Sequence, residues 1–223
     1  MPLRVAPAPP LPVPGRNTPR ARVVPVWASL LALALGGFGI GTTEFATMGV
    51  LPDIAGDLDT SIPTTGHAIT AYALGVVGGA PLFAVLGARV PRKGMLLALM
   101  AAIGLGNLLS ALAPSFGLLV LARFVSGLPH GAFLGIAAVV AAALVLPSRR
   151  ARAVATTMAG LTVANVVGVP LAKLLGQALG WRSTYVTVVV IAALTLVAVE
   201  LLVPRVSAGR DASPRRELAT LRR

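Results

Sequence analysis

Three ionisable residues, Glu44, Arg123 and His130, lie among long stretches that are otherwise free of charge. An ionised side chain in such an apolar setting costs about 2.5–3.5 kcal/mol or more, so it usually faces a cavity or a partner. Glu44 and Arg123 could form a pair that binds and releases a proton or gates a substrate, or a purely structural buried ion pair. His130 titrates near neutrality when unperturbed, although a hydrogen-bonded packing role is the simpler interpretation.

Membrane-spanning helices must position these residues. Of the 223 residues, 56% are hydrophobic and only 12% are charged, against about 25% charged in a typical soluble domain. Six long uncharged runs each approach the roughly 20 residues that a helix needs to cross a bilayer. Only 4% of the residues are aromatic and no segments alternate apolar and polar residues, which argues against a β-barrel. We therefore predict an all-α membrane protein with six transmembrane helices near 25–51, 65–87, 94–113, 117–146, 153–176 and 184–203.

The basic residues gather at one end of the predicted bundle. Most of the 19 lysines and arginines precede the first span, follow the last, or lie in the loops after the second and fourth spans. The opposite side carries Asp53, Asp57 and Asp59, with Arg182 as its clear basic loop residue. The positive-inside rule then places both termini in the cytoplasm. We expect a multi-pass protein of the plasma membrane. Because topology explains these basic residues, the net charge of +12 gives no support for nucleic-acid binding.

This topology also sets the depth of the three ionisable residues. A helix rises about 1.5 Å per residue, so Glu44 and Arg123 both lie roughly 10 Å below the outer surface. They could pair if the first and fourth spans touch. His130 lies deeper, near the middle of the fourth span, beside the helix-distorting Pro129.

The ends of the chain differ in composition from the bundle at 25–203. Residues 1–24 are rich in proline and arginine, which predicts a disordered cytoplasmic tail, and residues 204–223 predict a second basic cytoplasmic tail. The chain has no cysteine and its two histidines fall in different spans, so we expect no metal site. An intramembrane serine protease would need a Gly-x-Ser setting, whereas Ser126 follows Phe124 and Val125. We therefore expect no enzyme.

Glycines recur inside the spans at the spacing of close helix contact. This spacing predicts surfaces that face other helices. The residues concerned are Gly37 and Gly41, Gly75 and Gly79, and the series Gly127, Gly131 and Gly135.

The six spans divide into two units of three. The first three start in the cytoplasm and the last three start outside, so two three-helix units of opposite orientation follow one another. Each unit carries its membrane-embedded charge in its first helix. This is the inverted 3+3 repeat found within one half of a major facilitator transporter.

Several residue strings resemble the major facilitator superfamily. The loop after the second span reads LGARVPRKGML at 86–96, which resembles the family pattern G-x-x-x-D-R-x-G-R-R/K. Arg89, Arg92 and Lys93 match its basic positions and imply a gating loop. The sequence departs from the pattern at Ala84, Ala88 and Pro91, so the family's aspartate is absent.

Two further spans carry motifs of the same family. The fourth span reads LARFVSGLPHGAFLG at 121–135, which resembles the arabinose, purine-ribonucleoside and chloramphenicol exporters of the drug/sugar:proton antiporter branch. The fifth reads GLTVANVVGVPLAKLLGQ at 160–177 and resembles the antiporter motif. Gly160, Gly168 and Pro170 fit that motif, while Ala172 and Lys173 replace its small residues. The strings TTEFATMGVLPDIAGDL at 42–58 and LGWRSTY at 179–185 extend the resemblance over nearly all of 25–223.

The resemblance implies proton-driven export of a small molecule such as a drug, sugar or nucleoside. Glu44 would exchange protons, and Arg123 would tune this carboxylate. The proton gradient would be the energy source, and no cofactor would be needed. The implied partners are the lipid bilayer and the small-molecule substrate. Polar residues that could line the substrate cavity are Thr43, Tyr72, His130 and Asn165.

The resemblance also implies that the chain is one half of a longer fold. The superfamily has twelve spans in two halves with the substrate site between them. The final string, SPRRELATLRR at 213–223, resembles the linker that leads into a seventh span. We expect the product of a truncated or split gene whose C-terminal half is missing. The alternatives are a half-transporter that pairs with a second copy, and a non-transporting remnant or membrane assembly or regulatory subunit.

Overall fold

Long helices make up the bundle in this computed structural model, which describes residues 24–87 and 90–205. The two predicted tails fall almost wholly outside these residues, as does Arg89. Within these described residues, six helical segments are long and apolar enough to cross a membrane, which confirms the predicted number of spans. They are α1 (Val26–Gly49), α3 with α4 (Ile62–Thr65 and His67–Gly87), α5 (Arg92–Ala111), α6 with α7 (Phe116–Gly127 and His130–Ala143), the series η1, α8, η2 and α9 (Pro147–Arg149, Arg150–Val163, Ala164–Gly168 and Val169–Leu179), and α10 (Arg182–Leu202).

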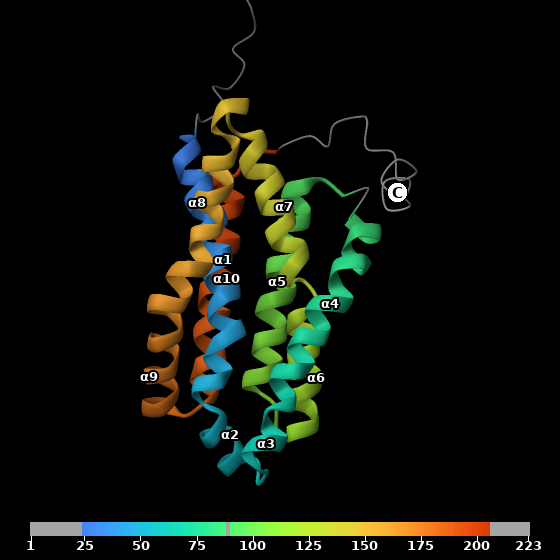
Figure 1. The fold of residues 1–223 in the computed structure, drawn as a ribbon, viewed down its shortest axis with the longest axis vertical. Helices are drawn as coiled ribbons and strands as arrows, with labels where there is room; N and C mark the ends of the chain where they lie inside the picture. Colours follow the sequence, from blue (N-terminus) through green and yellow to red (C-terminus); the bar gives the residue numbers. More distant parts are fainter. Residues whose placement is uncertain (1–23, 88–89, 206–223) are drawn as a thin grey trace, which may run out of the picture.

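One end of the bundle is more ordered than the sequence predicts. The segment after the first span forms α2 (Leu51–Asp57) and the short α3, which lie together at the lower end in Figure 1. Ser61 caps α3 because its hydroxyl accepts a hydrogen bond from the backbone N–H of Thr64 at 3.2 Å. At the opposite end, Val24 and Arg205 line a common pocket, so the described chain begins and ends on the same side.

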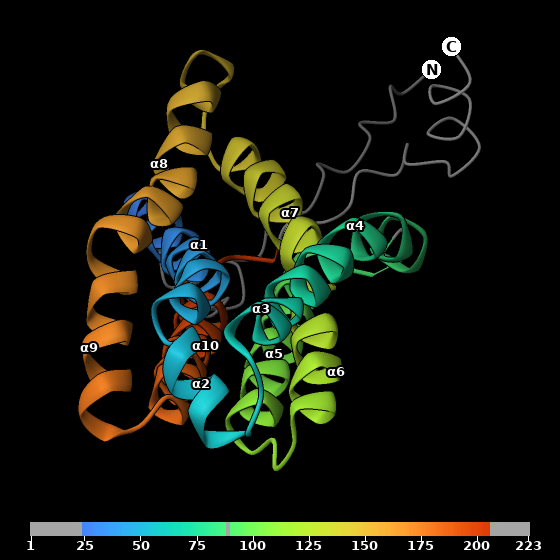
Figure 2. The ribbon, with the colours of Figure 1, turned by 60° about the horizontal axis from the view of Figure 1, so that its bottom comes forward.

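The helices pack as an inverted repeat. The α1 helix, which is the first span, packs against α8, the first half of the fifth span. In the same way α6 of the fourth span packs against α4 of the second span. The third and sixth spans, α5 and α10, pack against each other and lie side by side (Figure 2). Exchanging spans one, two and three with four, five and six therefore preserves the pattern of neighbours. The predicted all-α architecture, an inverted repeat of three and three helices, is confirmed.

Glycine allows the closest of these helix contacts. A Cβ at Gly75 or Gly79 of α4 would collide with the backbone carbonyl of Phe124 or Leu128, and one at Gly127 would collide with the carbonyl of Tyr72. The corresponding contact between α1 and α8 also depends on a glycine, because a Cβ at Gly160 of α8 would collide with a carbonyl of α1. Small residues thus let the backbones touch.

The prediction that the whole series from Gly127 faces other helices is wrong for two of its members. No described heavy atom lies within 4 Å of a Cβ built at Gly131 or Gly135. The reason is the break in the fourth span at Pro129, which has no N–H to continue the helix. Because α6 ends at Gly127 and α7 begins at His130, the later glycines no longer continue the row of Gly127.

Apolar side chains both fill the bundle and cover its outside. Leu33, Ile40 and Phe133 are completely buried in a core that α1, α5, α7 and α10 share. Val77 and Val85 on α4 are 74% and 77% exposed. Such an apolar exterior is unfavourable in water and is the surface that lipid requires.

Candidate functional site

A buried arginine is the centre of the polar interior. Arg123 of α6 is completely buried, so its permanently charged side chain needs hydrogen-bond partners. One terminal nitrogen donates to the hydroxyl of Thr43 at 3.0 Å and the other donates to the carbonyl oxygen of Thr43, also at 3.0 Å. Both acceptors lie on α1. The Nε atom has no partner among the described residues. Arg123 therefore fixes the first span to the fourth.

Two tyrosine rings complete the surroundings of this guanidinium. Its central carbon lies 4.3 Å from the ring centroid of Tyr72 on α4 and 5.5 Å from that of Tyr185 on α10. A cation within about 6 Å of an aromatic face is attracted by the ring's quadrupole. The positive charge is thus stabilised by ring faces and a carbonyl dipole.

A chain of buried hydrogen bonds begins at Thr43. Its hydroxyl donates to the amide oxygen of Asn107 at 2.6 Å while it accepts from Arg123. The amide nitrogen of Asn107 donates to the Ser126 hydroxyl at 3.2 Å and to the Ile103 carbonyl at 2.8 Å. The chain links α1, α5 and α6 in one network.

Sequence reasoning missed Asn107, Ser126 and Tyr185 as members of this site. All three are neutral, so a search for charge in apolar runs passed over them. An available signal was the amide of Asn107 inside an uncharged run, since a buried amide needs partners as a buried charge does.

Glu44 lies beside this network without joining it. It is half-buried on α1, next to Thr43, and it makes no hydrogen bond or ion pair with any described residue. The possible Glu44–Arg123 pair is therefore not formed in this structure. Successive helix residues point about 100° apart, so the guanidinium that reaches Thr43 meets a different face of α1 from the one that carries Glu44.

His130 pairs with Tyr72 near the break in the fourth span. The Tyr72 hydroxyl lies 2.9 Å from Nδ1 of His130, and the rings meet edge to face at 5.9 Å. Since Tyr72 also covers Arg123, His130 is connected to the arginine through one ring. The hydrogen-bonded packing role is the one that this geometry supports.

The remaining predicted cavity and motif residues lie on the fifth span. Asn165 is exposed on the π-helical turn η2 and donates only to the carbonyl of Leu161 in its own helix, at 3.1 Å, so it stays apart from the Arg123 network. Gly160 and Gly168 contact α1, and a Cβ at Gly168 would collide with the Thr42 hydroxyl. Pro170 lies in the first turn of α9. Its missing N–H accounts for the widened turn before it.

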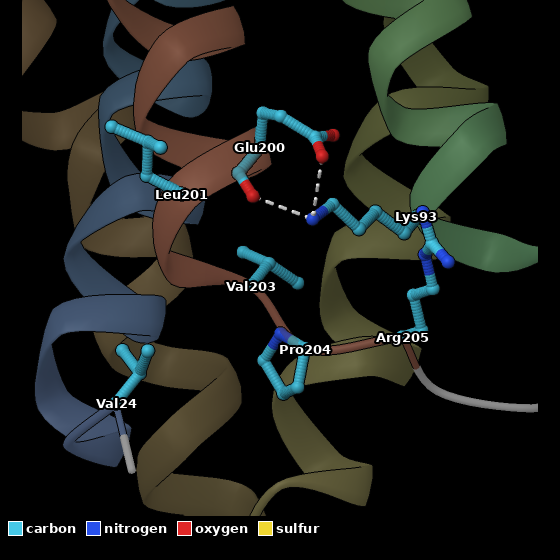
Figure 3. A pocket seen from close by; sticks show the side chains of 7 residues that line it. All are labelled: Val24, Lys93, Glu200, Leu201, Val203, Pro204 and Arg205. Atoms are coloured by element: carbon cyan, nitrogen blue, oxygen red, sulfur yellow. Dashed lines mark hydrogen bonds and ion pairs between the residues drawn. The ribbon is translucent and has the colours of Figure 1, made fainter. Parts of the chain in front are cut away.

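Two of the predicted gating residues, Arg92 and Lys93, lie at the end of the bundle where the described chain begins and ends. Arg92 is the first residue of α5, and Lys93 donates to the Glu200 carbonyl at 2.6 Å and pairs with its carboxylate at 3.3 Å. Figure 3 shows both contacts at the edge of a pocket. Lys93 thus joins α5 to α10.

A second ion pair closes the opposite end. Asp57 of α2 accepts a hydrogen bond from the Trp181 indole at 3.0 Å and pairs with Arg182, which also donates to the Ala113 carbonyl at 3.2 Å. Hydrogen bonds from Arg182 and then Trp181 lower the pKa of Asp57 below its ordinary value of 3.8. Asp57 thus joins α2 to the start of α10, and Arg182 links both to the loop after α5.

This fold and these motifs have close counterparts. The family model described as Major Facilitator Superfamily matches residues 33–222. The chain belongs to the major facilitator superfamily. The family consists of membrane transporters and not of enzymes, so the chain is a multi-pass membrane protein of a transporter family.

Three relatives agree with this assignment. The inner membrane transport protein YdhP of Escherichia coli K12 is 47% identical over 87% of this chain and 50% of its own length. The putative transporter AraJ of the same organism is 43% identical over 78% of this chain and 44% of its own. The chloramphenicol resistance protein of Streptomyces lividans is 42% identical over 72% of this chain and 41% of its own. The chain spans about half the length of these superfamily members.

Solved superfamily structures share the fold. The xylose transporter XylE from E. coli, in a partially occluded inward-open conformation, matches 87% of this chain and 52% of its own with a TM-score of 0.69 at 15% identity. A bacterial homologue of the lysosomal transporter Spinster matches 87% of this chain and 47% of its own with a TM-score of 0.68 at 19% identity. At such identities the likeness concerns the fold alone.

Proposed function

We propose that this chain is the N-terminal half of a proton-coupled exporter of small molecules. It would lie in the plasma membrane with both termini in the cytoplasm, as the distribution of its arginines and lysines predicts. Export of a drug, sugar or nucleoside is favoured by the motifs of the fourth and fifth spans and by the name of the 42% identical chloramphenicol resistance protein. The proton gradient would supply the energy.

The observation that carries this proposal is the contrast between Arg123 and Glu44. Arg123 is buried and fixed by Thr43 and two tyrosine rings, whereas Glu44, the next residue of α1, is half-buried and has no polar partner in the described part of the chain. A carboxylate inside a span that is not held in an ion pair can accept and release a proton at low structural cost. Protonation of Glu44 would remove a negative charge beside a permanent positive one and so change which helix arrangement is favoured.

Substrate binding would require a second six-helix half. In this fold the substrate site lies between two halves near the bilayer midplane. The second half would be a separate or continuing C-terminal half, or a second copy of this chain. The glycines with open space on α7, Gly131 and Gly135, follow His130 in the fourth span and are candidates for the wall of that cavity.

The test is gradient-driven efflux by the reassembled transporter in membrane vesicles. Glu44→Gln should abolish efflux driven by a pH gradient while leaving substrate exchange, which moves no net protons, in place. Asp53→Asn is the matched control because Asp53 is an exposed carboxylate in α2, outside the spans. Proton-driven efflux that survives in Glu44→Gln would contradict the coupling role. A reassembled protein that moves no substrate at all would favour the alternative of a remnant or an assembly or regulatory subunit.

A further inference from the structure

A second pocket opens beside the first turns of α1. It has a volume of about 530 Å³ and lies between the start of α1 and the connection from α7 to α8. The residues that matter for its chemistry are Trp27, Leu30, Leu31, Arg149, Arg152 and Thr156. This volume falls within the range of about 300–1,000 Å³ that small-molecule sites occupy.

The lining of this pocket has a cationic part and an apolar part. Arg149 and Arg152 come from η1 and the first turn of α8, with the hydroxyl-bearing Thr156 one turn further on. Trp27 and Leu31 on α1 are 65% and 54% exposed although they are large and apolar. A ligand that fits both parts carries negative charge at one end and hydrocarbon at the other.

The arginines of this pocket are not neutralised by any residue that the structure describes. The lining includes no aspartate or glutamate, and neither guanidinium forms an ion pair or donates a hydrogen bond within residues 24–87 and 90–205. The pocket of Figure 3, of about 430 Å³ at the same end of the bundle, differs in this respect. There Lys93 is already paired with Glu200. The two pockets therefore differ in charge compensation. The lysine of the Figure 3 pocket has a carboxylate partner, whereas the two arginines of the pocket beside α1 have no such partner among the described residues.

We infer that the pocket between α1 and α8 binds an anionic phospholipid, with the phosphate between Arg149 and Arg152 and the acyl chains along Trp27 and Leu31. The inference rests on the proposed orientation, which places this end in the cytoplasmic leaflet, where anionic lipids attract basic residues. Tryptophan favours the interface between headgroups and hydrocarbon, which is the depth that Trp27 would occupy. The bound lipid would bridge the first and fifth spans.

Native mass spectrometry of the detergent-purified protein tests the site directly. Phosphatidylglycerol should bind the wild-type chain more tightly than phosphatidylcholine, and glycerol phosphate without acyl chains should not compete. Arg149→Gln/Arg152→Gln should weaken phosphatidylglycerol binding on the order of twentyfold, because each basic residue near an anionic surface contributes roughly fivefold. The matched control is Arg150→Gln/Arg205→Gln, which removes the same charge from residues that do not line this pocket and should change binding little.

Three results would overturn the inference. Equal losses in the two double variants would show a general attraction to the basic surface. Equal binding of phosphatidylcholine would remove the role of charge, and competition by glycerol phosphate would show a site for soluble anions.

A second measurement needs no change to the arginines, in case the test variant does not fold. The chain has two tryptophans, so Trp181→Phe leaves Trp27 as the only one. Brominated phosphatidylglycerol should quench Trp27 fluorescence at lower concentration than brominated phosphatidylcholine, and equal quenching would contradict the site. Neither measurement depends on transport, so its failure is distinct from a failure of the proposed function.

Discussion

Arg123 donates hydrogen bonds to both the hydroxyl and the carbonyl oxygen of Thr43, at 3.0 Å each, and thereby holds the fourth span against the first. Because the carbonyl is part of the backbone, the guanidinium fixes the position of α1 itself. Glu44 follows immediately in the chain. The residue that the family resemblance assigns to proton exchange thus lies next to the residue through which Arg123 holds this helix.

Removing the Thr43 hydroxyl should weaken this contact. Thr43→Val keeps the shape but removes an atom that accepts from Arg123 and donates to Asn107. We expect the free energy of unfolding to fall by about 1.5–3 kcal/mol, because a hydrogen bond to a charged group is lost in a buried site. Denaturation in mixed detergent micelles, followed by circular dichroism, measures this change.

The neighbouring threonine provides the control. Among the described residues, the hydroxyl of Thr42 bonds only to the Phe38 carbonyl in its own helix, at 2.8 Å, so Thr42→Val should cost much less. Thr43→Ser, which retains the hydroxyl, should also be mild. Equal costs for Thr42→Val and Thr43→Val would show that the contact with Arg123 contributes little.

Two adjacent glycines in α4 should differ sharply in their tolerance of alanine. Gly79→Ala should lower the free energy of unfolding by about 1–3 kcal/mol, because the added Cβ meets the Leu128 carbonyl and forces α4 and α6 apart. Gly78→Ala is its matched control, since the Cβ at Gly78 meets nothing within 4 Å. Thermal unfolding in the same micelles compares the two. Similar melting temperatures would contradict the close approach of these helices.

The carboxylate of Asp57 should give part of the stability a pH dependence. Its pKa is lowered in the folded protein by Arg182 and Trp181, so the unfolded state binds the proton more readily. The contribution is present above the ordinary pKa of 3.8 and is lost as the pH falls through the lower folded value. Melting temperatures of wild type and Asp57→Asn should therefore converge below about pH 4. Asp53→Asn is the control, and a difference between wild type and Asp57→Asn that stays constant with pH would contradict this account.

The ion pair between Lys93 and Glu200 should be weak but measurable. The Glu200 side chain is 54% exposed, and pairs of this kind contribute about 0.2–1 kcal/mol, less at high salt. Glu200→Gln should cost less than Lys93→Ala, because Lys93 keeps its 2.6 Å hydrogen bond to the Glu200 carbonyl when only the carboxylate is removed. A double-mutant cycle at low and high salt isolates the pair. A coupling energy that salt does not change would contradict an ion pair between Lys93 and the Glu200 carboxylate.

The sequence by itself determined the six spans, their 3+3 order and the family. A span requires only an uncharged run of sufficient length, and a motif requires only residues at fixed spacing, so both are properties that are local in the chain. The same local reasoning selected Arg123 and Glu44, because a charge among apolar neighbours is visible without knowing what surrounds it.

Only the tertiary structure decided which groups meet. Arg123 binds Thr43 and not Glu44, although the two residues differ by one position, because one step along a helix turns a side chain by about 100°. Asn107, Tyr185 and the Lys93–Glu200 pair come from segments far apart in sequence, and Gly131 and Gly135 lose their helix contact through a break at Pro129. These contacts depend on the rotation of each helix about its axis and on the angle at which neighbouring helices cross. The hydropathy pattern along the chain determines neither the rotation nor the crossing angle.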